Sequence, residues 1–207
     1  GTPSNREIID FSDERRRHGV LLGREALLGE LTALCDEAAA GGGWVLVQGG
    51  PGLGKSALLS RWLGSLEAPR WPHHFIRRSV EDWDQPGRIA ASLAAQVESR
   101  FPAQADPAAD PAARLPALLR RVSQQVLQPD HATLVLVIDG LDEASGDAAH
   151  NLLPRFLPAN LPPRVVVLCS SRPDYPRLEW LRARRGAALA HPGVEPGRFV
   201  ELIVADS

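Results

Sequence analysis

The sequence has 207 residues, of which 44% are hydrophobic and 23% charged, and this composition predicts a globular domain with a sizeable core. The formal net charge of −2 provides no basic field of the kind that holds proteins on nucleic acid or anionic membranes, so we expect neither as a partner. Two cysteines are too few for a disulfide framework, and no apolar run approaches the ~20 residues of a membrane-spanning helix. These properties favour a cytoplasmic protein.

We expect one domain. Residues 1–18 are polar and charged, and we interpret them as an N-terminal linker ahead of a core over residues 19–207. The sequence contains no methionine, which favours a fragment of a longer protein. Apolar residues at helical spacing predict a helix over 21–40, and the glycines after it precede a strand of β-branched and aromatic residues at 44–48.

Strands and helices alternate through the rest of the chain. The expected strands are 73–80, 133–139, 164–171 and 198–207, and the expected helices are 58–66, 87–101, 114–127, 148–156 and 177–186. An Ala-, Pro- and Asp-rich stretch between the second and third of these helices is expected to be an exposed loop. The alternation predicts a three-layer α/β fold, in which helices cover both faces of a mainly parallel five-stranded sheet.

A glycine-rich loop lies between the strand at 44–48 and the helix that follows it. The stretch GGPGLGKS, residues 49–56, matches the complete pattern of a phosphate-binding loop, in which glycines let backbone N–H groups converge on phosphate oxygens. Lys55 is expected to reach the β- and γ-phosphates, and the Ser56 hydroxyl to ligate Mg²⁺. The residues expected to contact the nucleotide here are Gly49, Gly50, Pro51, Gly52, Leu53, Gly54, Lys55, Ser56 and Ala57.

Carboxylates follow the apolar strand at 133–139. Asp139 ends that strand at the edge of the sheet where ligands of such folds bind, so it is expected to hold Mg²⁺ directly or through water. Asp142 and Glu143 come next, and one of them, with a preference for Asp142, is expected to orient or deprotonate a water near the γ-phosphate. The alternative is that these two residues only favour the start of the next helix.

These motifs resemble those of the NACHT branch of the STAND class of signal-transducing ATPases. The stretch DGLDE at 139–143 is similar to the metal-binding motif of that branch. The stretch GRE at 23–25 looks like the short motif that precedes the phosphate-binding loop in that branch, and CSSRPDY at 169–175 resembles its sensor motif. The resemblance covers residues 20 to about 175, with the motifs in the order of the family.

The resemblance implies a fold and roles for further residues. Arg172 would read the γ-phosphate, and the adenine and ribose would be lined by Leu21, Leu22, Gly23 and Arg24. Two alternatives stay open: Arg172 as a solvated turn residue, and Arg24 as part of the polar face of a helix. The implied fold is the additional-strand class of P-loop NTPases, in which the strand ending at Ser171 separates the Asp139 strand from the phosphate-loop strand.

By the same resemblance, the expected function is a Mg²⁺-dependent ATP/ADP switch. It would hydrolyse ATP slowly and control conformation or homo-oligomerisation in bacterial signalling, programmed death or defence against phage. Relatives continue with a winged-helix domain and sensor repeats, which this sequence does not include. ATP is expected over GTP because no Asn-Lys pair of the kind that GTPases use for guanine is present. The alternatives are a nucleotide-retaining scaffold with negligible turnover and a P-loop kinase for a small acceptor.

Overall fold

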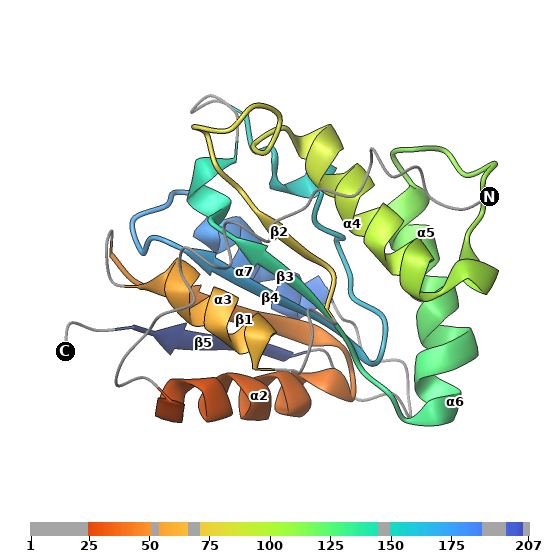
Figure 1. Ribbon diagram of the computed structural model, residues 1–207, viewed down its shortest axis with the longest axis horizontal. Coiled ribbons are helices and arrows are strands. Elements are labelled where there is room, and N and C mark those ends of the chain that lie inside the picture. The colour runs from red at the N-terminus through yellow and green to blue at the C-terminus, as the bar shows by residue number, and fades with distance from the viewer. Residues whose placement is uncertain (1–24, 51–53, 66–70, 145–149, 188–197, 205–207) are drawn as a thin grey trace.

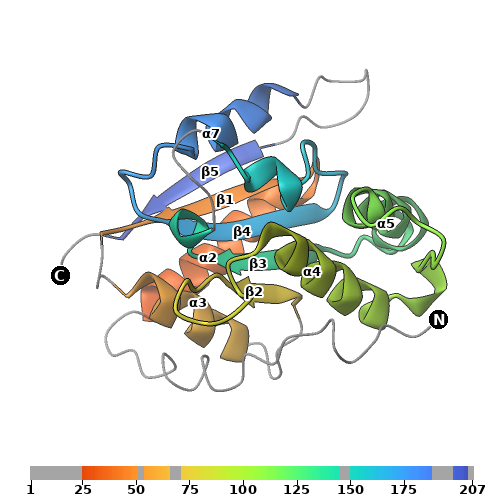
Figure 2. The ribbon, with the colours of Figure 1, turned by 90° about the horizontal axis from the view of Figure 1, so that it is seen from above.

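The computed structural model describes residues 25–50, 54–65, 71–144, 150–187 and 198–204. Its strands are β1 (Gly43–Gln48), β2 (His73–Phe75), β3 (Leu134–Asp139), β4 (Val165–Ser171) and β5 (Arg198–Ile203). They form one sheet in the order β2-β3-β4-β1-β5, and every neighbouring pair is parallel (Figure 1, Figure 2). The expected parallel sheet is confirmed, and β4 separates the strand that ends in Asp139 from the strand that leads into the glycine-rich loop.

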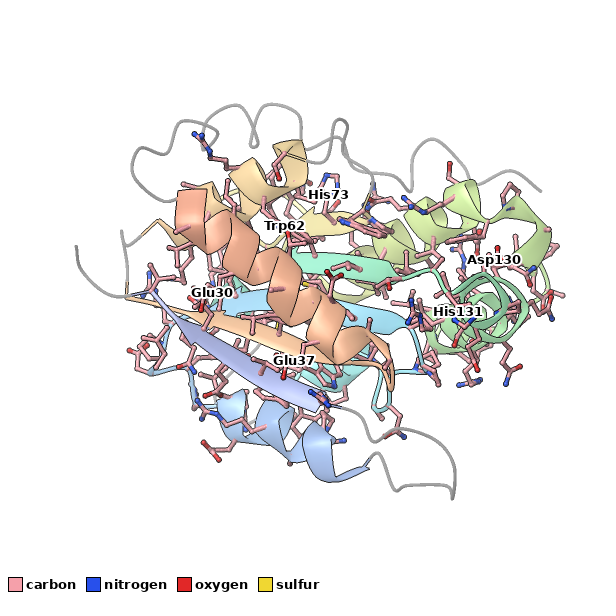
Figure 3. All side chains as sticks on the ribbon, turned by 90° about the horizontal axis from the view of Figure 1, so that it is seen from below. Glu30, Glu37, Trp62, His73, Asp130 and His131 are labelled. Atoms are coloured by element: carbon pink, nitrogen blue, oxygen red, sulfur yellow. The ribbon has the colours of Figure 1, made fainter. Side chains whose placement is uncertain are left out.

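Helices cover both faces of this sheet. The longer ones are α2 (Glu25–Ala39), α3 (Lys55–Gly64), α4 (Pro86–Arg100), α5 (Arg114–Val122) and α7 (Leu178–Ala187). One apolar core lies between the sheet and helices α2 and α3, and a second lies between the opposite face and helices α4, α5 and α7. Figure 3 shows α2 lying across the sheet beside α3, where the Trp62 indole N–H donates to Thr32 Oγ1 at 3.0 Å. None of the described helices is long and apolar enough to cross a membrane.

Alternation along the strands divides the apolar side chains between the two cores. In β1, Val45 and Val47 pack with α2 and α3, whereas Trp44 and Leu46 belong to the opposite core. Every residue of β1, β3 and β4 is buried, which explains their near-continuous apolar sequences. A slip of one residue would exchange the two sets of side chains, so burial also fixes the register of each strand.

The strand expected over 73–80 is shorter than predicted. It ends at Phe75, and the chain then enters a series of turns, in which Val80 N donates to Arg77 O and Trp83 N to Val80 O. The last backbone bond from this segment to β3 is the one that the Ile76 N–H donates to the Asp139 carbonyl oxygen at 2.8 Å, and the residues in the turns after it do not extend the ladder.

Two expected helices also differ from the prediction. In the described residues, the one expected at 148–156 is a single 3-10 turn, Leu153–Arg155. Pro154, inside the expected helix, has no N–H for a helical bond, and Pro158 just beyond it disfavours helical backbone in the residue before it. The helix expected over 114–127 is longer, because α5 continues through a π-helical turn, Ser123–Leu127, into α6 (Gln128–Asp130).

Two glycines provide a matched test of this backbone. Gly42 has a φ of 77°, and a Cβ added there would lie 2.4 Å from the Pro162 carbonyl oxygen, whereas Gly29 lies exposed in α2 with nothing within 4 Å of an added Cβ. We expect Gly42→Ala to lower the free energy of unfolding by more than about 1–2 kcal/mol. Gly29→Ala should raise it by about 0.5–1 kcal/mol. Urea unfolding measures both, and a Gly42→Ala chain as stable as the parent would contradict the geometry.

Candidate functional site

The glycine-rich loop joins β1 to α3 at the carboxyl edge of the sheet. Gly54 has a left-handed φ of 82° and begins the helix, and its carbonyl oxygen accepts the Leu58 N–H at 2.8 Å. Of the three glycines of this loop that the structure describes, Gly54 has a positive φ, and Gly49 and Gly50 do not. Lys55, Ser56 and Ala57 form the first turn of α3, while Pro51, Gly52 and Leu53 lie outside the described residues.

The ammonium group of Lys55 turns back over this loop. Its Nζ donates to the carbonyl oxygens of Gly49 and Gly50, the latter at 3.0 Å. Burial lowers the pKa of Lys55 from its ordinary value, and the carboxylates of Asp142 and Asp139 oppose that shift. The charged group is therefore fixed at the N-terminus of α3, where the helix dipole also favours a bound anion.

The carboxylate of Asp139 lies at the centre of the site. It ends β3 with only 1% of the residue exposed. Its Oδ2 accepts a hydrogen bond from Ser56 Oγ at 2.6 Å, and its Oδ1 accepts one from the Ser170 hydroxyl. Ser170 Oγ in turn accepts the Gly140 N–H at 2.9 Å. The structure thus brings together the hydroxyl and the carboxylate that the sequence assigns to Mg²⁺, from residues 83 positions apart.

A third group at this point, the guanidinium of Arg77, is absent from the sequence prediction. Its Nη2 lies 2.6 Å from Asp139 Oδ2 and 3.0 Å from Ser56 Oγ, and its Nη1 donates to the Ile76 carbonyl oxygen at 2.7 Å. Residue 77 falls inside the strand expected over 73–80. Its place at the edge of the sheet where ligands of such folds bind follows only once β2 is known to end at Phe75.

Asp142 and Arg172 form a pair across two neighbouring strands. Asp142 lies in the 3-10 turn Leu141–Glu143 after β3, and Arg172 follows the last residue of β4. The Arg172 backbone N–H donates to Asp142 Oδ1 at 3.2 Å, and Arg172 Nε lies 3.4 Å from Asp142 Oδ2. The guanidinium is half exposed, so this ion pair is open to exchange with another anion.

Glu143 lies in the same turn and faces Arg77. Its Oε2 is 3.4 Å from Arg77 Nη1, a longer contact than the one that Arg77 makes with Asp139. Partial burial raises the pKa of Glu143 above its ordinary value, while the charge of Arg77 acts in the opposite direction. The structure therefore places all three predicted catalytic residues, Asp142, Glu143 and Arg172, around the end of β3.

The donor set of the site suits one kind of metal. Among the described residues, no three His, Cys, Asp and Glu side chains are grouped to hold a metal ion. Ser56 and Asp139 instead offer one hydroxyl and one carboxylate, which fits Mg²⁺ because this ion keeps several waters and takes its other ligands from substrate phosphates. The predicted adenine and ribose contacts, Leu21, Leu22, Gly23 and Arg24, lie outside the described residues.

One solved structure shares the fold. The crystal structure of Cdc6p from Pyrobaculum aerophilum is similar, with 14% identity and a TM-score of 0.50 over 94% of this chain and 49% of that chain. The structure of C. elegans PCH-2 follows with 12% identity and a TM-score of 0.41, over 92% of this chain and 45% of that one. The chain therefore spans about half the length of these structures.

Comparison by sequence identifies the family. No curated protein matches the chain. A family model described as AAA ATPase domain matches residues 20–168, which is more than half of the chain and includes the glycine-rich loop and Asp139. With that match, the chain belongs to the AAA ATPase domain family, as a nucleotide-binding P-loop ATPase domain of AAA type.

Proposed function

We propose that this domain is a nucleotide switch of the NACHT branch of the STAND class, which binds ATP or ADP with Mg²⁺ and hydrolyses ATP slowly. The observation that carries the proposal is the 2.6 Å contact between Ser56 Oγ and Asp139 Oδ2, one residue away from Lys55. A hydroxyl, a buried carboxylate and a lysine after a glycine-rich loop are the groups that hold a magnesium-bound polyphosphate.

Phosphate binding would change the partners of Lys55. Its ammonium is now satisfied by two loop carbonyl oxygens, which are neutral acceptors. Phosphate oxygens are charged acceptors, and hydrogen bonds to them are roughly twice as strong. Ser56 and Asp139 would hold Mg²⁺, which neutralises charge on the β- and γ-phosphates. The chain's own part is to orient the phosphates against α3 and to hold the Asp139 carboxylate in place by its hydrogen bonds.

Glu143 is better placed than Asp142 to activate water. The carboxylate of Asp142 is engaged by both the backbone and the side chain of Arg172. The carboxylate of Glu143 is partly exposed, and its pKa is raised by burial, which makes it a stronger base. We therefore assign the proton transfer to Glu143, in place of the sequence preference for Asp142.

The pair formed by Asp142 and Arg172 supplies a two-state element. A γ-phosphate would compete with Asp142 for the half-exposed guanidinium, whereas ADP offers no such group. The position of Arg172 would then differ between the ATP and ADP states, and differential contacts of this kind are what allow a ligand to shift a conformational equilibrium.

The assignment to the NACHT branch rests on the motifs around residues 23–25, 139–143 and 169–175. In that setting Leu21, Leu22, Gly23 and Arg24 line the adenine and ribose. The parent protein carries a winged-helix domain and sensor repeats, acts in the cytoplasm and forms homo-oligomers on activation, in bacterial signalling or antiphage defence. A scaffold that retains ADP and a kinase for a small acceptor are the alternatives that the following experiments separate.

Lys55 is the only lysine in the sequence, so amine chemistry reports on it directly. Its lowered pKa leaves more neutral amine for acetylation, and MgATP or MgADP should protect it, as read by mass spectrometry of its peptide. The α-amino group of the chain is the internal control, and nucleotide should leave its acetylation unchanged. Lys55→Ala should weaken nucleotide binding at least about tenfold in calorimetric titration. Equal acetylation with and without nucleotide would contradict the proposed contact.

Isosteric variants test the two carboxylates. Glu143→Gln should lower kcat for phosphate release by about 100-fold or more and leave ATP binding in place, whereas Asp142→Asn should have the smaller effect on kcat. Because the ionised carboxylate is the base and burial raises its pKa, phosphate release should fall as the pH drops through that raised pKa. A larger loss in Asp142→Asn would reverse the assignment. Phosphate release from ATP without any added acceptor would exclude a kinase. Tight ADP binding without phosphate release would favour the scaffold.

A further inference from the structure

The guanidinium of Arg77 occupies the position where the two predicted Mg²⁺ ligands meet. Its Nη2 lies within hydrogen-bond distance of both Ser56 Oγ and Asp139 Oδ2. The same two oxygen atoms are 2.6 Å from each other, so the three groups form a closed triangle. A positive charge is thus already present at the oxygen atoms that would receive a metal ion.

The surroundings of Arg77 hold it there. Its Nη1 donates to the Ile76 carbonyl oxygen and lies near Glu143 Oε2, and its guanidinium carbon lies 5.6 Å from the centroid of the Phe75 ring. The side chain is only 13% exposed. A guanidinium suits this place because its planar fork holds several N–H donors in a fixed geometry, whereas an ammonium is a compact charge on a flexible stem.

A metal ion and this guanidinium would compete for the two oxygen atoms. Mg²⁺ sits at 2.0–2.1 Å from its ligands. An ion bound to Ser56 Oγ and Asp139 Oδ2 on the side of Arg77 would meet Nη2, which lies 3.0 Å and 2.6 Å from the same atoms. An ion on the opposite side would share one buried carboxylate with a second cation, and repulsion between the two positive charges opposes joint occupancy.

We propose that Arg77 is an internal cation that occupies the magnesium position and that magnesium-bound nucleotide must displace. The inference rests on the proposed nucleotide site and adds to it a competition for one pair of oxygen atoms. Arg77 keeps the buried Asp139 charge neutralised before nucleotide binds, and it lowers the affinity of the site for metal. It is a positioning residue: it acts on Asp139 and Ser56, and through them on the metal.

Removal of Arg77 should therefore tighten metal binding. Mn²⁺, followed by electron paramagnetic resonance, serves as the probe for the magnesium position, alone and with ADP. Arg77→Gln should bind Mn²⁺ about tenfold more tightly than the parent chain in both conditions, and Arg77→Lys should lie between the two. Arg78→Gln is the matched control, because it removes the same charge one position along while its guanidinium donates to the Asp142 carbonyl oxygen at 2.9 Å; its effect on Mn²⁺ should be smaller.

Thermal unfolding provides a readout that needs no nucleotide. Without Arg77, the buried Asp139 charge loses its ion pair, so Arg77→Gln should melt below the parent chain and regain most of that difference when Mg²⁺ is added. The parent chain should respond to Mg²⁺ by a smaller shift. If Arg77→Gln does not fold, Arg77→Lys takes its place in the test. Because a lysine cannot reproduce the fork of donors, this variant should bind Mn²⁺ more tightly than the parent chain, and an equal affinity would overturn the inference.

The outcomes separate this inference from the proposed function. An Arg77→Gln chain that binds ADP in EDTA but binds Mn²⁺ no more tightly than the parent would overturn the competition. A Mn²⁺ affinity that falls would also overturn it, and a fall seen with ADP but not with Mn²⁺ alone would make Arg77 a phosphate ligand instead. If no chain binds ADP under any condition, the proposed nucleotide site fails, and the experiment with Mn²⁺ alone still decides whether Arg77 occupies a metal position.

Discussion

The buried carboxylate of Asp139 is the constraint on which the rest of the site depends. An unpaired charge at this depth would cost several kcal/mol, of the order of 3–5, so its hydrogen bonds and its ion pair are a condition of folding as well as of function. The chain meets that condition with one donor from α3, one from β4 and one from the segment after β2: Ser56, Ser170 and Arg77. Three elements are thereby tied to the end of β3.

The parallel sheet makes this convergence unavoidable. Phe75 of β2 pairs with Asp139 of β3, and Ser171 of β4 pairs with Gln48 of β1, so the carboxyl ends of four strands lie level. Whatever follows these strands therefore meets at one edge, which is where open α/β sheets bind ligands. Residues far apart in the sequence become neighbours because all the strands point the same way, and both faces of the sheet are packed by helices that hold the strands in register.

The loop and the acidic strand end could be predicted because each is a local pattern. Residues 49–56 match a motif whose mechanism fixes its spacing, and Asp139 is the first charge after an apolar run. Arg77 could not be found in this way. Its role depends on β2 ending at Phe75 and lying next to β3, and strand order is a property of the whole fold that no short stretch records. The prediction of a helix at 148–156 was wrong over its described part for a local reason, since Pro154 and Pro158 limit helical structure there to one 3-10 turn.

Lys55 and Arg77 have in common that the protein itself supplies their partners. Lys55 is bound to loop carbonyl oxygens, and Arg77 to Asp139 and Ser56. In the proposed switch, magnesium-bound nucleotide therefore exchanges one set of contacts for another, and its affinity is the difference between the two sets. A phosphate-binding site without such internal partners would bind nucleotide more tightly, but its conformation would be the same with and without nucleotide. Because a ligand shifts a conformational equilibrium only by its differential affinity, cations that change partners are what would connect nucleotide state to protein shape.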